Sequence, residues 1–398
     1  MRIGLFGGTF NPIHSGHLKA LEIFAEYVDG LTVVMPAGNP PHKSFQRSIS
    51  DKDRLNLVKK AIGERNNIVV SDYEITKREK SYTVDTLKML RAEYGNESEI
   101  FLYVGSDSFL NLTDWYLPAE ILKMATPVCL VRRNEDKTAV KKKKKELKKL
   151  FGTESVILPF NPIEISSSEL RDMLSFNNPE SVLYFPETVF DVIQKKKLYF
   201  SGNEEDPELC RLARSVRERT DFYRYRHCVG VMKTARELAI INGANQRKAE
   251  IAGILHDITK HFTEKQQLQL VQKYDINVDE MQLRYPKILH GLTASYVVKY
   301  ELGIDDREIL SAIKYHSTAK PRMTPLEMIV WAADFVDPTR DYEDIDYYRD
   351  LVYNDLKTAN FKLLAYTLQD LASRGKYIHK DTFNAYNYYA IINEENKK

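Results

Sequence analysis

The stretch IGLFGGTFNPIHSGH, residues 3–17, decides the fold of the first half of this chain. A short apolar run over residues 3–6 leads through two glycines into an amphipathic, helix-like pattern. This arrangement is typical of phosphate sites, because glycines let the backbone approach an anion and a helix N-terminus offers unpaired N–H groups. His14 and His17 stand three residues apart at that helix start, so we expect both imidazoles to converge on one anion.

Further apolar runs alternate with amphipathic stretches through the rest of the first half. The runs cover residues 31–36, 68–72, 100–104, 128–131 and 156–158, and the helical stretches include 17–27, 50–62 and 83–94. Such βαβ alternation predicts a Rossmann-like α/β fold, with a parallel sheet and helices on both faces. The lysine-rich stretch 138–151 favours a solvated helix over a tether for phosphate or nucleic acid.

The pattern changes at the acidic, turn-rich segment SGNEEDP, residues 201–207. Beyond it apolar residues recur at helical spacing and strand signals are nearly absent, which predicts an all-α second half. A chain of 398 residues is long enough for two hydrophobic cores. We therefore expect a first domain over residues 1–198, a linker over 199–206 and a second domain over 207–398.

The composition indicates a cytoplasmic protein. A net charge of +2 gives no reason to expect nucleic acid as a partner. Three cysteines without paired spacing predict no disulfide framework and fit a reducing compartment. The N-terminus shows neither a charged leader nor a long apolar run, so we expect no signal peptide and no membrane span. The oligomeric state stays open.

Residue types that bind metals are scattered through the helical half. The set consists of His227, His256, Asp257, His290, His316 and Asp334. Imidazoles and carboxylates suit iron, manganese or similar divalent ions, and the thiolates of a structural zinc site are missing from the set. Two metals held together activate water and bind phosphate oxygens, which is the usual logic of phosphoester hydrolysis. The set therefore predicts a two-metal site, although any one of these histidines alone would more often be structural.

The motifs of the first half resemble the nucleotidyltransferase superfamily and, more narrowly, bacterial nicotinate-nucleotide adenylyltransferases. The resemblance covers about residues 1–198 and runs in order through GGTFNPIHSGH (7–17), PAGNPPHK (36–43), SYTVDTL (81–87), GSD (105–107) with Trp115, and ISSSELR (165–171). It implies adenylyl transfer from ATP, with Mg²⁺, to nicotinate mononucleotide (NaMN), catalysed by His14, His17 and Arg171. The choice of NaMN over NMN as the substrate rests on the resemblance alone. The alternative is that the first half is a phosphopantetheine adenylyltransferase.

The same resemblance implies a set of substrate contacts. They are Gly7, Gly8, Thr9, Phe10, Asn39, Lys43, Thr83, Gly105, Asp107, Trp115, Arg132, Ile165, Ser166 and Ser168. Structural alternatives stay open for several of them. Ser166 fits a plain helix N-cap, Trp115 fits a core position, and Arg132 fits an exposed one.

The helical half resembles the HD-domain phosphohydrolases, in particular the bacterial symmetrical diadenosine tetraphosphatases. The strings LHDITK (255–260), ILHG (288–291), AIKYHS (312–317) and WAADFVDPTR (331–340) carry the resemblance, which covers about residues 207–393. It implies hydrolysis of diadenosine tetraphosphate (Ap4A) to two ADP. A different nucleotide hydrolysis, or a regulatory nucleotide-binding module without turnover, is the alternative.

This second resemblance also implies how the metal ligands divide. One metal would be held by His227, His256, Asp257 and Asp334, and the other by His290 and His316 with Asp257 shared. Lys260 is implied as a catalytic residue and Arg340 as a phosphate contact, and each also fits a surface ion pair. The pair Ser317–Thr318 departs from the turn expected there, which loosens the substrate assignment.

Overall fold

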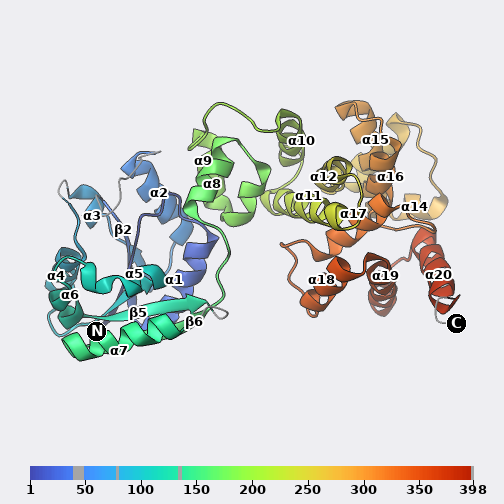
Figure 1. The fold of residues 1–398 in the computed structure, drawn as a ribbon. Helices are drawn as coiled ribbons and strands as arrows, with labels where there is room; N and C mark the ends of the chain where they lie inside the picture. Colours follow the sequence, from blue (N-terminus) through green and yellow to red (C-terminus); the bar gives the residue numbers. More distant parts are fainter. Residues whose placement is uncertain (39–48, 78–79, 133–136, 396–398) are drawn as a thin grey trace. The chain divides into compact units, whose positions relative to one another are not determined.

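The structure is a computed structural model that describes residues 1–38, 49–77, 80–132 and 137–395. The chain divides into two compact units, which Figure 1 shows in sequence colours: Met1–Phe176 with Tyr184–Asn203, and Asn177–Leu183 with Glu204–Lys398. The step from Asn203 to Glu204 falls inside the segment expected as a linker. The short segment Asn177–Leu183 packs with the second unit, where Glu180 pairs with Arg236 at 2.6 Å.

The first unit is built on a six-stranded parallel sheet in the order β3-β2-β1-β4-β5-β6. The strands are β1 (Arg2–Gly8), β2 (Leu31–Pro36), β3 (Ile68–Val70), β4 (Glu99–Gly105), β5 (Ala125–Arg132) and β6 (Val156–Phe160). All six predicted strands are confirmed. β1 lies between β2 and β4, so the strand order reverses there, and open α/β sheets bind ligands at the carboxyl end of such a switch point.

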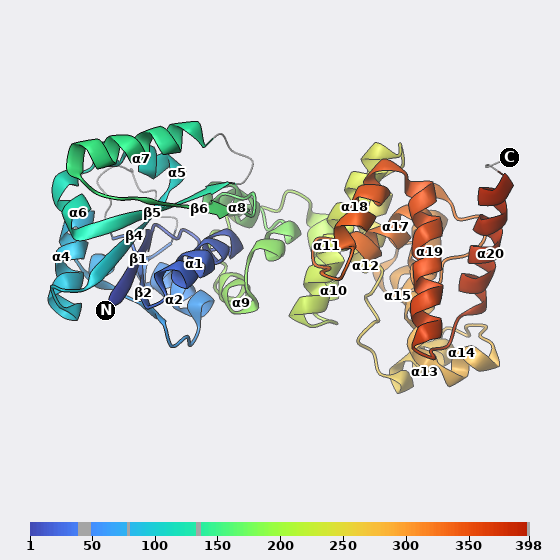
Figure 2. The same ribbon diagram turned by 90° about the horizontal axis from the view of Figure 1, so that it is seen from below.

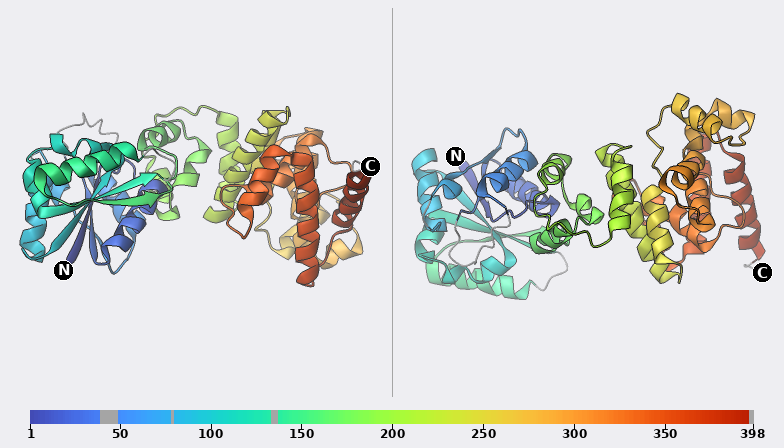
Figure 3. Two further views of the ribbon diagram at one scale, coloured as in Figure 1. Left: turned by 60° about the horizontal axis from the view of Figure 1, so that its bottom comes forward. Right: turned by 90° about the horizontal axis from the view of Figure 1, so that it is seen from above.

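Helices cover both faces of this sheet (Figure 3). The helices of this unit are α1 (Ser15–Val28), α2 (Asp51–Ile62), α3 (Tyr73–Thr76), α4 (Thr83–Tyr94), α5 (Ser106–Leu110), α6 (Pro118–Met124), α7 (Thr138–Phe151), α8 (Ser167–Ser175) and α9 (Glu187–Lys196), with a short 3₁₀ turn at η1 (Leu112–Asp114). Most of a second 3₁₀ turn, η2 (Pro179–Tyr184), belongs to the second unit. α1 packs so closely on one face that a Cβ on Gly4 would lie 2.7 Å from the Phe24 ring. Buried residues of α4, α6 and α7 join the core on the other face.

Two local features of the first unit differ from a simple reading of the pattern. β5 begins at Ala125 and runs through Pro127, which reads as a strand break in sequence but pairs opposite Leu102. The lysine-rich helix α7 is amphipathic rather than solvated all round. Lys143, only 8% exposed, donates to Thr113 Oγ1 at 2.8 Å, while Leu147 lies fully in the core.

The second unit is helical throughout its described residues, as predicted (Figure 2). Its helices are α10 (Pro207–Arg217), α11 (Phe222–Ile241), α12 (Gln246–Leu255), α13 (Glu264–Lys273), α14 (Glu280–Arg284), η3 (Pro286–Leu289), α15 (His290–Leu302), α16 (Arg307–Tyr315), α17 (Pro325–Val336), α18 (Ile345–Asn354), α19 (Leu356–Ser373) and α20 (Lys380–Glu395). Among the described residues of the chain, no helix combines the length and apolarity needed to cross a membrane.

Candidate functional site

A cavity of about 200 Å³ opens at the carboxyl ends of β1, β2 and β4. Gly7 and Gly8 form its floor on β1, and Ser81, Tyr82, Thr83, Trp115 and Tyr116 contribute to its wall. A Cβ on Gly7 would meet no atom within 4 Å, so this part of the backbone faces open space. The cavity therefore occupies the switch point of the sheet, with aromatic rings beside a bare backbone edge.

His14 and His17 lie together at the start of α1. His14 is the N-cap residue, its Nδ1 accepts from the Gly16 N–H at 3.2 Å, and its ring centroid lies 3.9 Å from that of His17. Burial lowers the pKa of His14 to about 4. Burial, and then the charge of His14, lowers the pKa of His17 to about 3. Both rings are therefore neutral at pH 7, and each keeps one N–H that can donate to an anion.

Arg171 on α8 reaches back to the loop that follows β1. It donates to the Asn11 carbonyl oxygen at 2.8 Å and to Ser168 Oγ at 2.9 Å. The neighbouring Ser167 hydroxyl donates to the Pro12 carbonyl oxygen at 3.2 Å. These contacts join two motifs that lie 160 residues apart in the sequence.

Ser166 caps α8, the structural reading that the sequence left open. Its hydroxyl accepts from the Glu169 N–H at 3.1 Å, and the Glu169 carboxylate accepts from the Ser166 N–H at 2.8 Å. This capping box leaves the other orphan N–H groups of the first turn available to a phosphate. The cap and a phosphate role are compatible.

Of the remaining predicted contacts of the first unit, some line the cavity and others lie elsewhere. Thr83 and Trp115 line the cavity. Phe10 is fully buried and stacks on Phe6 with ring centroids 6.0 Å apart. Asp107 is exposed in the first turn of α5. The Thr9 carbonyl oxygen accepts from the buried Arg54 side chain at 2.8 Å. Gly105 is the last residue of β4, Arg132 is the last residue of β5, and Ile165 precedes the α8 cap. Asn39 and Lys43 lie outside the described residues.

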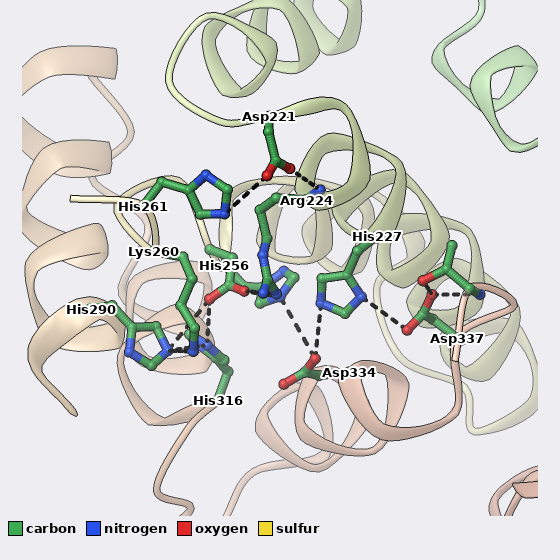
Figure 4. Close-up of polar contacts among 12 residues, drawn as sticks. Asp221, Arg224, His227, His256, Lys260, His261, His290, His316, Asp334 and Asp337 are labelled. Carbon is green, nitrogen blue, oxygen red and sulfur yellow. Dashed lines mark hydrogen bonds and ion pairs between the residues drawn. The ribbon is translucent and has the colours of Figure 1, made fainter. Parts of the chain in front are cut away.

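Three helices and the ends of two others bring the predicted metal ligands of the second unit together (Figure 4). His227 lies in α11, Asp334 in α17 and His290 at the start of α15, while His256 with Asp257 follows α12 and His316 follows α16. The helices approach closely because glycines stand at the contacts. A Cβ on Gly253 would lie 2.7 Å from Met232 Cα, and one on Gly291 would lie 2.8 Å from the Lys314 carbonyl oxygen.

Asp257 is the centre of the cluster. Its Oδ1 lies 3.2 Å from His316 Nε2 and 3.4 Å from His290 Nε2, and its Oδ2 lies 3.6 Å from His256 Nε2. On the other side, His227 Nε2 lies 3.0 Å from Asp334 Oδ1. The ligand atoms fall into three overlapping groups, each with all of its atoms within 4.8 Å of one another, and Asp257 belongs to two of them.

All four imidazoles are turned so that Nε2 faces the cluster. Carbonyl oxygens receive the Nδ1–H of three rings at 2.7 Å: Gly253 from His256, Lys287 from His290 and Ile313 from His316. The fourth ring, His227, contacts Asp337 Oδ2 through Nδ1 at 3.0 Å. Because a carbonyl oxygen only accepts, the three carbonyl contacts select the tautomer whose Nε2 lone pair can bind a metal. At His227, burial lowers the pKa, but the carboxylates of Asp334 and Asp337 outweigh it and raise this pKa to about 9.

The buried polar atoms show that this cluster fits divalent cations. His256 Nε2 and Asp257 Oδ1 are buried without a hydrogen-bond partner among the described residues. An unsatisfied buried polar atom costs about 1–3 kcal/mol, so such atoms normally have a partner. Burial alone would raise the pKa of Asp257, but the charges of His256 and Lys260 outweigh it and hold this pKa well below its usual range. The carboxylate is therefore ionised and able to bridge two cations.

Three cationic side chains face the cluster. Arg224 contacts Asp257 at 2.7 Å, Arg340 contacts Asp334 at 2.6 Å, and Lys260 Nζ lies 3.0 Å from His290 Nε2. Lys260 and Arg340 were expected near the site from sequence, whereas Arg224 was missed.

Sequence reasoning also assigned no role to Asp337, which is fully buried against His227. Helical spacing could have found Arg224, because it stands three residues before His227 on α11 and such pairs share one face of a helix. Asp337 lies just past the end of α17, so helical spacing gave no signal for it.

Comparison with known proteins agrees with the two sites. Residues 5–173 match the family described as Cytidylyltransferase-like, and residues 224–339 match the HD domain family. A Mycoplasma genitalium protein named "Probable nicotinate-nucleotide adenylyltransferase/Ap4A hydrolase" is 30% identical over 375 residues, which span 92% of this chain and 97% of that protein.

Relatives of single units are similar to each half separately. A Clostridium perfringens "Probable nicotinate-nucleotide adenylyltransferase" is 36% identical over 199 residues, which cover 50% of this chain and 98% of that protein. A Bacillus subtilis "Bis(5'-nucleosyl)-tetraphosphatase, symmetrical" is 34% identical over 186 residues, which cover 47% of this chain and 97% of that protein. The chain therefore belongs to the family of two-domain proteins that join a nicotinate-nucleotide adenylyltransferase to an HD-type Ap4A hydrolase.

Proposed function

We propose that the protein is a bifunctional enzyme of nucleotide metabolism. Its first unit transfers the adenylyl group of ATP to NaMN, and its second unit hydrolyses Ap4A to two ADP. The observation that carries this proposal is that each unit has its own phosphate chemistry: a neutral histidine pair at a helix N-terminus in one, and imidazole Nε2 atoms around a shared carboxylate in the other.

In the first unit, a phosphate oxygen of NaMN attacks the α-phosphorus of ATP. The bond from that phosphorus to the bridging oxygen breaks, and pyrophosphate leaves with the electron pair. His14 and His17 donate N–H groups to the phosphoryl oxygens, where negative charge develops, and the α1 N-terminus adds its partial positive charge. Mg²⁺ bound with ATP would screen the triphosphate charge.

The other proposed contacts follow from their positions. Gly7 and Gly8 let the nucleotide approach the sheet edge, and Thr83 and Trp115 receive the pyridine ring in the adjoining cavity. Arg171 lies beside the α8 cap, where it can reach the leaving phosphates. The contacts of ATP and NaMN with the remaining positions stay predictions: Thr9, Phe10, Asn39, Lys43, Gly105, Asp107, Arg132, Ile165, Ser166 and Ser168.

In the second unit, water attacks one of the two central phosphorus atoms of Ap4A, and the central P–O–P bridge breaks to give two ADP. Two divalent cations, iron or manganese, would supply the activation of water and positive charge for the phosphate oxygens. We assign His227, His256, Asp257 and Asp334 to one cation, and His290 and His316 to the other with Asp257 shared. Lys260 and Arg340 hold the phosphate chain.

The test uses the full chain with one variant in each unit. His17→Ala should lose formation of deamido-NAD from NaMN and ATP but keep Ap4A hydrolysis. His256→Ala should show the opposite pattern, so each variant controls the folding of the other. Hydrolysis is assayed with Fe²⁺ or Mn²⁺ under reducing conditions, and NMN and phosphopantetheine are compared with NaMN.

Three outcomes would overturn parts of the proposal. If Ap4A stayed intact while a mononucleotide lost phosphate, the second unit would be a different phosphohydrolase. Metal binding without any phosphate release would make it a regulatory module. Pyrophosphate release with phosphopantetheine but not with NaMN would reject the substrate proposed for the first unit.

A further inference from the structure

A second cavity, of about 470 Å³, lies in the helical unit and shares no lining residue with the metal cluster. Its walls are the turn before α17, the first turns of α17 and α19, and the last turns of α20. Figures 1 and 2 show α19 between α17 and α20. The volume falls within the range of roughly 300–1,000 Å³ typical of small-molecule sites.

The floor of this cavity is apolar and aromatic. Met323 is 5% exposed, and Met328, Phe361 and Tyr389 are half-buried around it. Packing holds these side chains in place: Phe361 stacks on Tyr386 with an interplanar angle of 18°, and the Tyr389 hydroxyl accepts from the Met323 N–H at 2.8 Å. Ordered rings and thioethers form a surface suited to a flat aromatic ligand.

The rim of the cavity is cationic. Arg322 and Lys357 are both exposed, and Thr358 adds a hydroxyl beside them. Asp355 stands beside this rim and accepts from the Thr358 hydroxyl at 2.6 Å, and that hydrogen bond together with the charge of Lys357 lowers the pKa of the Asp355 carboxyl. Arg322 also adopts a left-handed backbone conformation with φ 55, which costs a non-glycine residue roughly 1–2 kcal/mol and tends to persist at binding sites.

We propose that this cavity binds a purine nucleoside phosphate. The base lies on the floor against Phe361, with Tyr388 of α20 also lining the cavity, and the phosphate is held by Arg322 and Lys357. Aromatic stacking contributes about 1–3 kcal/mol per base without base selectivity, and guanidinium and ammonium groups both pair with phosphate. An alkyl-chain anion would share the charge but would leave the flat ring surface unused.

The position of the cavity links it to the metal cluster through one helix. Met328 on the cavity floor and Asp334 in the cluster both lie on α17, six residues and about 9 Å apart along the axis. An occupant that shifts the start of α17 would therefore reach a metal ligand. Binding itself does not rest on the proposed hydrolysis, whose product ADP is one member of this ligand class.

The test is photolabelling of the full chain with 8-azido-ADP, without added metal, followed by mass spectrometry of the labelled peptides. We expect label on α19 or α20, at peptides that contain Phe361 or Tyr388, and competition by unlabelled ADP. The double variant Arg322→Gln/Lys357→Gln should reduce that label by about tenfold or more, because two charge-assisted contacts are lost. Probe bound at the adenylyltransferase site or at the metal site labels other peptides, so mass spectrometry distinguishes it from probe bound in this cavity.

Two further variants make the result interpretable. Lys362→Gln, on the same helix but paired with the Tyr347 hydroxyl outside the cavity, should label like wild type. Met328→Trp should fill the floor and remove the label while both cations remain. The proposal is overturned if α19 and α20 stay unlabelled at millimolar probe, if the charge variant labels like wild type, or if palmitate competes as well as ADP.

Discussion

Asp337 holds His227 from behind the metal cluster, and replacing it by asparagine tests that contact together with the weaker pairing of the same carboxylate with Arg340 at 3.4 Å. The carboxylate is fully buried, lies 3.0 Å from His227 Nδ1, and accepts from the Thr339 N–H at 2.9 Å and hydroxyl at 2.5 Å. Asparagine keeps the shape but removes the charge that favours the Nδ1–H tautomer. Loss of such an outer partner costs about 10- to 100-fold in metal affinity, or about 1.4–2.8 kcal/mol.

The assay titrates metal-free full-length protein with Mn²⁺ and follows Ap4A hydrolysis. We expect Asp337→Asn to move the Mn²⁺ midpoint upward by about 10- to 100-fold, with the hydrolysis rate recovering at saturating metal. Asp346→Asn is the matched control, because its side chain is 92% exposed and contacts only Arg349 among the described residues. Adenylyl transfer by the same samples reports whether the first unit is intact, and the melting temperature reports folding of the unit that carries Asp337.

The result that refutes the reasoning is a Mn²⁺ midpoint indistinguishable from wild type in a variant with an unchanged melting temperature. Asp337 would then be a structural residue of the α17 end and not a positioning residue for His227. A rate that stays low at saturating Mn²⁺ would also contradict it, because weakened metal binding alone is rescued by metal.

Three more outcomes follow from the contacts. Gly230→Ala places a Cβ 2.6 Å from Asp337 Oδ1, so the Mn²⁺ midpoint of Ap4A hydrolysis should rise in this variant as well. An unchanged midpoint would mean that the Asp337 carboxylate can move aside without disturbing the cluster. NMR should find that His14 and His17 titrate near pH 4 and pH 3, and pyrophosphate should raise both pKa values. Because both pKa values lie below the ordinary value of about 6.5, the folding stability falls as the pH drops below about 6.5. Titration of either ring near pH 6.5 would contradict the buried pair. Arg171→Lys loses a two-nitrogen fork and should slow adenylyl transfer by roughly 10-fold or more while Ap4A hydrolysis is unchanged; an equal loss of both activities would indicate misfolding.

Much of the first unit could be predicted because its signals are local. Short apolar runs located all six strands, and the contiguous string around His14 and His17 placed both rings at one helix start. The sequence did not show that Phe10 is buried under the loop, since burial depends on the ring of Phe6 in the strand beneath it. Nor did it show that β5 continues through Pro127, because the pairing partner lies on another strand.

In the second unit, the sequence predicted some residues of the site, and only the structure revealed others. Residue types, together with the resemblance to the HD-domain phosphohydrolases, indicated six candidate metal ligands, and the structure brings the ligand atoms of all six into neighbouring groups. Arg224 and Asp337 were missed because an arginine and a further aspartate carry no metal signal of their own. Only their contacts, with Asp257 and His227, reveal what they do.

The sequence by itself determined the types of element and indicated the candidate phosphate-binding string at the start of α1 and the candidate ligand side chains. These features depend on the local pattern of apolar residues and on side-chain chemistry, and both can be read from residues that are close together in the sequence. The resemblance already implied Asp257 as the shared carboxylate, and only the tertiary structure decided which carboxylate orients His227, a contact across 110 residues of sequence. That choice depends on how closely whole helices pack, as at Gly253 and Gly291, and spacing along the chain does not encode it.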